Sequence, residues 1–265
     1  MSEKLIDLMG FSTVPAISTG NLVKDNIANA KLYEKLLNEN KELYPVFVHK
    51  DYDLDYLWLT LGWGKEGEPK EAYEDTVKWV IKKVEFCCFD VWLGRILYNY
   101  SLDCYKDPND VHGYFNKLIP PASAEYLQIF ENAKELKDCG LFHEDEVEAK
   151  HADMWIRFDD YIIALLPINN PWEALAWFPM GRFNNCPAPE YQIALARELY
   201  ESFGARVMLI GKDRLTYYLD KPLYSREEIC KASRTLIIAD GDIFPNYMDA
   251  VNQTIGRHTW QLWWD

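Results

Sequence analysis

The sequence predicts an α+β fold with a mixed, largely antiparallel sheet, built from hairpins, on which helices pack. One hairpin is expected where "MWIRF" meets "YIIALLPI" across Asp159-Asp160, and a second where "ARVMLI" meets "LTYYLD" across "GKDR". Helical patterns between and after these hairpins favour α+β over a doubly wound parallel sheet. The closing "HTWQLWW" alternates as a strand does, so the C-terminal strand is expected to lie in the sheet.

Residues 1–140 form a mainly helical N-terminal region with at least one strand. Residues 1–28 are interpreted as a loosely held arm. The apolar spacing in "NAKLYEKLLNENKEL" predicts a helix, and the β-branched and aromatic "YPVFVH" at 44–49 predicts a strand. Further amphipathic helices are expected after Pro69 and in the segment that ends near Gly140.

A charged stretch, "FHEDEVEAKHAD", is the best boundary in the chain because it has no sustained apolar period. We therefore expect a linker at residues 141–153 and a C-terminal α+β domain at residues 154–265. The N-terminal region either packs on this domain or stands apart from it.

The C-terminal domain continues with a loop, "NNPWEALAWFPMGRFNNCPAPE", and then a helix that stops at Gly204 as a C′ glycine. Ser225 and Glu228 form a capping box at the start of the next helix. A last helix is expected to begin at Pro245 and to end at Gly256.

Composition excludes several classes of function. The 265 residues include 28 Lys and Arg against 42 Asp and Glu, a net charge of −14, which argues against nucleic acid or an anionic membrane as a partner. No apolar run approaches the roughly 18 residues of a membrane span. The six cysteines form no Cys-x-x-Cys pair and no signal peptide is evident, so a reducing, cytoplasmic location is expected.

The C-terminal part carries several spaced motifs. These are an apolar strand ending in Pro, a Gly-x-aromatic-Asn-x-Cys-Pro loop, a Phe-Gly-Ala step into a strand, and a closing Trp-Trp-Asp. The residues at these positions are Pro167, Gly181, Phe183, Asn184, Cys186, Pro187, Phe203, Gly204, Ala205, Trp263, Trp264 and Asp265.

On these motifs, residues 155–265 resemble a bacterial family described as domain of unknown function 4253. Two departures stand out. Arg182 and Phe183 occupy positions where Gly and Trp are common in the family, and "IIADGDIFP" replaces a second Cys-Pro-Asp. The resemblance implies a fold and a set of site residues, and it implies no reaction.

Cys186 is the candidate catalytic residue. It precedes a helix start, where the helix dipole stabilises a thiolate. His258 would act as its base and Asp265 or Asp242 would orient the imidazole. The alternative is that Cys186 is a small buried hydrophobic residue that fixes the loop.

The candidate binding residues are Arg182, Asn184, Trp172, Trp177 and Trp263. A guanidinium at position 182 could hold the carboxylates of Asp265, and Asn184 could bind a ligand or tie down its own loop. The indole rings could form the floor of a ligand groove. The alternative is that they pack onto the sheet.

Neither a metal site nor a cofactor site is expected. His143, Glu144, Asp145, His151 and Asp153 match no zinc spacing and read as a solvated linker. Cys87 and Cys88 are adjacent, too close for ordinary disulfide geometry, and read as core. The sequence has no P-loop, no Gly-x-Gly-x-x-Gly and no Gly-x-Ser-x-Gly motif.

Taken together, the sequence favours a non-enzymatic cytoplasmic module that binds a basic protein partner or a small ligand. A toxin-immunity protein is one form of such a module, suggested by the charge alone. The alternatives are a Cys-dependent hydrolase or transferase that uses Cys186 with His258, and a structural component of a larger assembly.

Overall fold

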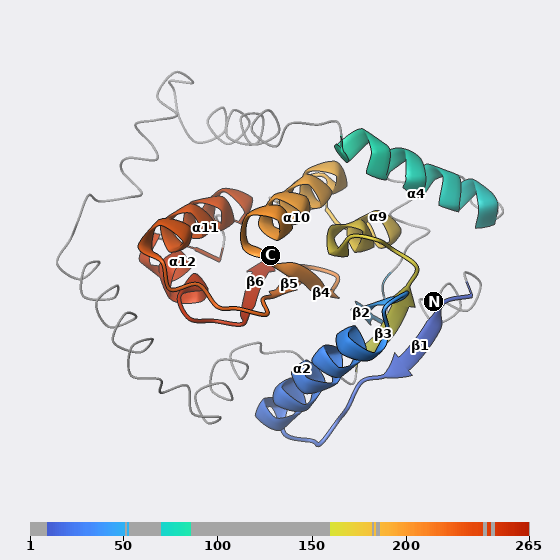
Figure 1. The fold of residues 1–265 in the computed structure, drawn as a ribbon, viewed down its shortest axis with the longest axis horizontal. Coiled ribbons are helices and arrows are strands. Elements are labelled where there is room, and N and C mark those ends of the chain that lie inside the picture. Colours follow the sequence, from blue (N-terminus) through green and yellow to red (C-terminus); the bar gives the residue numbers. More distant parts are fainter. Residues whose placement is uncertain are drawn as a thin grey trace.

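A six-stranded mixed sheet organises the molecule (Figure 1). The computed structural model describes residues 10–50, 52, 70–85, 160–181, 183, 186–240, 243–244 and 247–264. The strands are β1 (Ser12–Pro15), β2 (Tyr44–His49), β3 (Tyr161–Leu166), β4 (Arg206–Ile210), β5 (Arg214–Tyr218) and β6 (Thr259–Trp263), in the order β1-β3-β2-β4-β5-β6. Only the β2–β4 pair among them is parallel. The predicted α+β class is confirmed, with the C-terminal strand at one edge of the sheet.

Helices cover both faces of this sheet. They are α2 (Leu22–Glu39), α4 (Lys70–Glu85), η2 (Pro171–Glu173), α9 (Ala174–Trp177), α10 (Pro189–Phe203), α11 (Arg226–Ala239) and α12 (Tyr247–Thr254). Tyr33 of α2 packs edge-on against Tyr218 at 5.4 Å, whereas Phe203 of α10 packs against Trp260, the cross-strand neighbour of Tyr217. Successive strand residues point to opposite faces, so α2 and α10 lie on opposite sides of the sheet.

The N-terminal residues are more ordered than the expected arm. β1 pairs with β3, and α2 begins at Leu22 behind Asn21, whose side chain accepts a hydrogen bond from the Lys24 amide. The Asn29 side chain bonds both backbone groups of Ile17, at 2.8 and 2.7 Å. The prediction of a loose arm is therefore wrong for residues 11–28, because side-chain hydrogen bonds tie the segment to α2.

β2 lies between β3 and β4 and joins the two halves of the sheet. Its register runs antiparallel to β3 and parallel to β4 at Phe47↔Leu209. The predicted first partner of β3, "MWIRF", lies outside the described residues, and β3 pairs instead with β1 and β2. The predicted linker at 141–153 also lies outside the described residues, so the predicted domain division stays a prediction.

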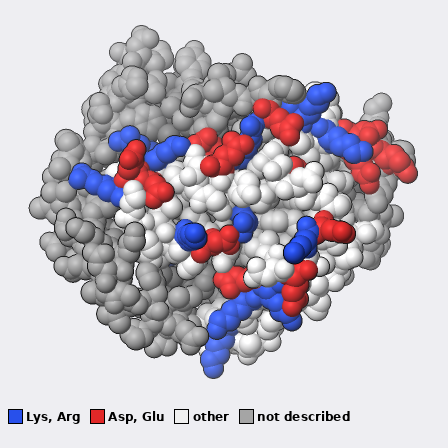
Figure 2. Space-filling model, viewed as in Figure 1, with Lys and Arg blue, Asp and Glu red and all other residues white. Residues whose placement is uncertain are grey.

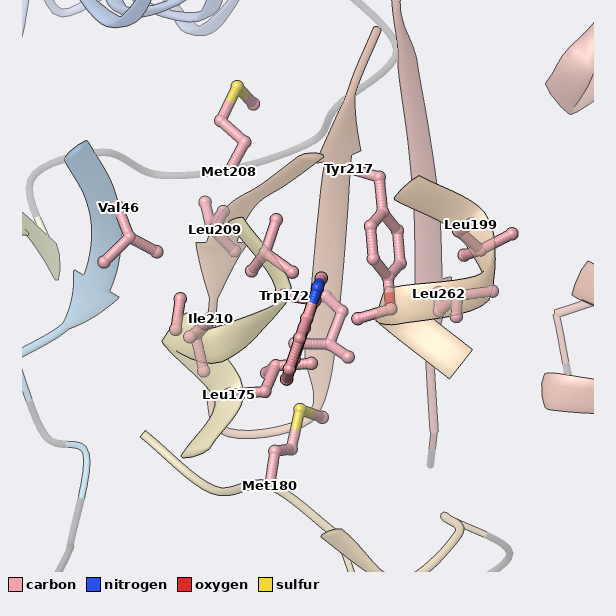
Figure 3. Close-up of a cluster of buried hydrophobic side chains, with 14 of the residues drawn as sticks. Val46, Trp172, Leu175, Met180, Leu199, Met208, Leu209, Ile210, Tyr217 and Leu262 are labelled. Atoms are coloured by element: carbon pink, nitrogen blue, oxygen red, sulfur yellow. The ribbon is translucent and has the colours of Figure 1, made fainter. Parts of the chain in front are cut away.

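The local predictions in the C-terminal part agree with the structure. β4 and β5 pair antiparallel, Gly204 ends α10 with φ 71°, and the Ser225 side chain caps α11. The expected loop after β3 departs from prediction, since it contains η2 and α9. These short helices place Trp172 and Leu175 in a buried cluster with side chains from β2, α10, β4, β5 and β6 (Figure 3). No helix among the described residues is long and apolar enough to cross a membrane.

Candidate functional site

Cys186 is a buried residue in the segment that leads into α10. Its thiol is only 5% exposed and accepts a hydrogen bond from Gln192 Nε2 at 3.3 Å. Burial raises the pKa of the thiol well above its ordinary value, and the bond from Gln192 only partly offsets that effect. Cys186 is therefore a protonated thiol packed in the core at neutral pH.

His258 does not meet Cys186. Its ring stacks on Tyr218 at 6.2 Å and its Nδ1 lies 2.8 Å from the Leu219 carbonyl oxygen. Cys186 lies instead beside Tyr217, where a thiolate would add to the rise in the tyrosine pKa that burial causes. Tyr217 and Tyr218 point to opposite faces of β5, so the thiol and the imidazole are on opposite sides of the sheet.

Two aspartates hold the C-terminal tail. Asp213 accepts from the Trp263 indole at 2.9 Å, and the Asp240 carboxylate accepts from the Trp263 amide at 2.6 Å. The Trp264 amide and indole donate to the carbonyls of Asp213 and Ala239. Burial acts to raise the pKa of Asp213, but hydrogen bonds from Arg214 and Trp263 outweigh it and lower the pKa. Trp263 thus has a structural contact that the sequence did not reveal.

The other indoles proposed for binding are buried. Trp172 is 3% exposed and lies under the Arg197 guanidinium at 6.0 Å. Trp177 packs edge-on against Phe11 and Tyr73, at 5.2 and 5.6 Å. Both positions match the packing alternative.

Several predicted site residues lie outside the described part of the chain. They are Arg182, Asn184, Asp242 and Asp265, together with the charged residues His143, Glu144, Asp145, His151 and Asp153 and the pair Cys87 and Cys88. Within the described ranges, no group of three or more His, Cys, Asp or Glu side chains could hold a metal ion.

A groove of about 680 Å³ opens at one end of the sheet, where residues of both α2 and α10 line it. Its walls come from the C-terminal half of α2, the loop into β2, the loop after β3, and the adjoining ends of α10, β4 and β5. The lining residues are Glu34, Leu37, Asn38, Asn40, Lys41, Glu42, Leu43, Tyr44, Ile168, Asn169, Pro171, Tyr200, Arg206, Tyr218 and Asp220. We refer to this feature as the α2 groove.

A pair of buried hydroxyls fixes one wall of the α2 groove. The hydroxyls of Tyr33 and Tyr44 lie 2.5 Å apart, and Tyr44 donates to the Val207 carbonyl at 2.6 Å. The β4–β5 register shifts between Val207 and Leu209, a bulge of the kind that re-aims groups near binding sites. Burial raises the pKa of both tyrosines, so these hydroxyls stay neutral and the wall keeps its hydrogen bonds.

Charged side chains line the groove beside these tyrosines. Arg206 Nη1 contacts both carboxylate oxygens of Asp220, at 2.8 and 2.6 Å. Burial acts to lower the pKa of Arg206, but Asp220 together with the neighbouring tyrosines outweighs it, and the pKa is raised. Tyr218 donates to Glu34 Oε1 at 2.6 Å, and its pKa is raised, first by burial and then by Glu34. Tyr218 is therefore a neutral hydroxyl that donates to Glu34 and lies within electrostatic reach of Asp220.

No local pattern in the sequence marks this groove. Glu34 and Tyr218, which are hydrogen-bonded to each other in its lining, are 184 positions apart in the chain. In the sequence, Glu34 directly follows a core position of the predicted helix, and Tyr218 lies in the predicted "LTYYLD" strand. Both are ordinary in a helix or a strand, so only the fold brings them together.

Comparison with curated proteins and with solved structures gives no match for this chain. A family model covers the chain from the second residue of β3 to the last residue. The motifs noted above, from the Gly181 loop to the closing Trp-Trp-Asp, all lie within that range. Residues 162–265 thus match the family described as Domain of unknown function (DUF4253), as the resemblance predicted.

Proposed function

We propose that this protein is a non-enzymatic binding module and that its ligand binds in the α2 groove. The observation that carries the proposal is the groove itself. Its volume of about 680 Å³ falls in the range of ligand pockets, roughly 300–1,000 Å³. Hydrogen-bonding side chains line it, and the Tyr33–Tyr44–Val207 contacts hold one wall in place before a ligand arrives.

The Cys-dependent alternative has less support. A nucleophilic thiol needs a lowered pKa and a base within hydrogen-bond reach. Burial raises the pKa of Cys186, and His258 lies across the sheet from it. We therefore prefer the binding role.

The ligand class follows from charge. The net charge of −14 would steer a basic protein towards the molecule. Figure 2 shows acidic and basic side chains interspersed on the described surface in that view. We assign the local recognition to the α2 groove, which has a volume and a polar lining suited to a ligand. We place the module in the cytoplasm, where thiols such as Cys186 and Cys230 stay reduced, and a toxin-immunity role is one form it could take.

The test is a ligand screen with a matched pair of variants. Asn38 lies exposed on α2 and lines the groove, whereas Lys35 lies exposed on the same helix outside the lining. Small polar molecules and short peptides are screened against the full chain by two-dimensional NMR. We expect ligands that shift groove resonances, that fail to bind Asn38→Trp, and that still bind Lys35→Trp. Ligands that bind both variants equally would place the site elsewhere.

A further inference from the structure

The side chains that line the α2 groove limit the class of ligand it can bind, and Glu34 is the first of them. This half-buried carboxylate lies on the groove wall, and its hydrogen bond comes from the neutral Tyr218 hydroxyl. The ion pairs among the described residues include none to Glu34, and Lys35 beside it pairs with Glu39 at 3.8 Å. A partly buried carboxylate without a cation keeps part of its desolvation cost, which a bound cation would offset.

The cations that line the groove leave Glu34 available. Arg206 gives one guanidinium nitrogen to both oxygens of Asp220. Lys41 lies at the exposed rim beside Glu42, where solvent screens both charges. Glu34 is therefore a lining carboxylate to which no cation among the described residues is paired.

A second carboxylate acts at the same point. Both Glu34 and Asp220 raise the pKa of Tyr218, so both lie within electrostatic reach of its hydroxyl. Because Asp220 is paired with Arg206, a cation placed beside that hydroxyl would be attracted chiefly by Glu34. An anion there would be repelled by Glu34, whose charge no ion pair among the described residues balances.

The rest of the lining suits a long side chain with a charged end. Leu37, Leu43 and Tyr200 provide apolar surface in the same groove. Lys and Arg bury their aliphatic stems on such surface while the charged head reaches a polar partner. Asn38 and Asn40 add amide groups to the lining.

We propose that the α2 groove binds the cationic side chain of an arginine or lysine from a basic protein segment, with Glu34 as its counter-charge. This inference rests on the proposed binding function and specifies its partner. The net charge of −14 favours a protein segment over a free small cation, because long-range attraction grows with the charge on the partner.

The test uses three capped tripeptides, Gly-Arg-Gly, Gly-Lys-Gly and Gly-citrulline-Gly, titrated against the full chain by NMR at low salt. Citrulline matches arginine in shape but carries no charge. We expect the arginine or the lysine peptide to bind about tenfold or more tighter than the citrulline peptide, as for a hydrogen bond to a charged group. Added salt should weaken that preference.

A matched pair of variants assigns the effect to Glu34. Glu34→Gln should lose about tenfold or more of the affinity for the cationic peptide. Glu39→Gln removes the same charge from an exposed site on the same helix and should bind as the wild type does. Equal melting temperatures for the two variants show that the fold is kept.

These measurements distinguish a failure of the cationic preference from a failure of the proposed binding function. If all three peptides bind equally and Asn38→Trp abolishes binding of each, the groove is a binding site but the cationic preference is wrong. If no cationic peptide binds, or if Glu34→Gln binds as tightly as the wild type, this inference is overturned. The NMR screen with Asn38→Trp and Lys35→Trp then decides the binding function separately.

Discussion

The thiol of Cys186 lies in the segment that leads into α10, where a helix dipole would lower the pKa of an exposed thiol. In the structure the side chain is 5% exposed and burial raises its pKa instead. Burial penalises the thiolate, and the hydrogen bond from Gln192 offsets that effect only in part. Sequence position alone could not decide between these two effects, since it shows the helix start and not the burial.

The burial of Cys186 predicts that its thiol reacts slowly with alkylating reagents. At a pH of about 8, iodoacetamide should label Cys186 at least about tenfold more slowly than Cys230, which is partly exposed. Mass spectrometry of each cysteine peptide measures both rates in one sample, and unfolding in urea should make the rates equal.

The raised pKa of Cys186 determines how its contribution to stability changes with pH. The folded state favours the protonated thiol, so its contribution to stability is complete below the unfolded pKa of about 8.5 and is lost as pH rises above it. If Cys186 is labelled faster than Cys230 in the folded protein, with a titration below that value, the buried-thiol interpretation is wrong.

At the scale of an element, glycine is favoured at positions 181 and 204 for two different reasons. Gly181 has a φ of 131°, and a Cβ there would lie 2.0 Å from the Pro187 carbonyl oxygen. The loop therefore closes on itself at Gly181. Gly204 ends α10 with a φ of 71°, and a Cβ there would meet no heavy atom within 4 Å.

Alanine substitutions should separate these two cases. Gly181→Ala combines a strained φ with a backbone collision, so we expect a loss of about 3 kcal/mol or more in the free energy of unfolding. Gly204→Ala meets only the φ penalty and should cost about 1 kcal/mol. Urea unfolding of both variants measures the difference. Equal losses would mean that the Gly181–Pro187 contact does not constrain the loop.

Elements fixed by neighbouring residues could be predicted from the sequence, and long-range pairings could not. The Gly204 stop and the Ser225 cap depend on residues close in the chain, and both predictions are confirmed. The segment around Ile17 is held by a hydrogen bond to Asn29, twelve positions away, and the sequence did not predict it. The α2 groove depends on Glu34 meeting Tyr218, which no periodicity in either segment reveals.

For the whole molecule, β2 is the element that makes one sheet out of two parts. It lies between β3 and β4, yet it precedes the family match, which begins at residue 162. The family region therefore lacks one central strand of its own sheet in this protein. Tyr44 of β2 and Glu34 of α2 also line the groove, so the candidate site spans the same division.

A fragment of residues 154–265 tests this dependence. Without β2, strand β3 has no link to β4, and the fragment loses Val46, Phe47 and Val48, all fully buried. Burying each such side chain is worth about 1.5–3 kcal/mol, so their loss approaches the whole stability of a domain. We expect the fragment to show no cooperative urea transition by circular dichroism and to leave the groove ligands of the full chain unbound. A fragment that unfolds cooperatively would show instead that the C-terminal region completes its sheet without β2, as the predicted domain at residues 154–265 implies.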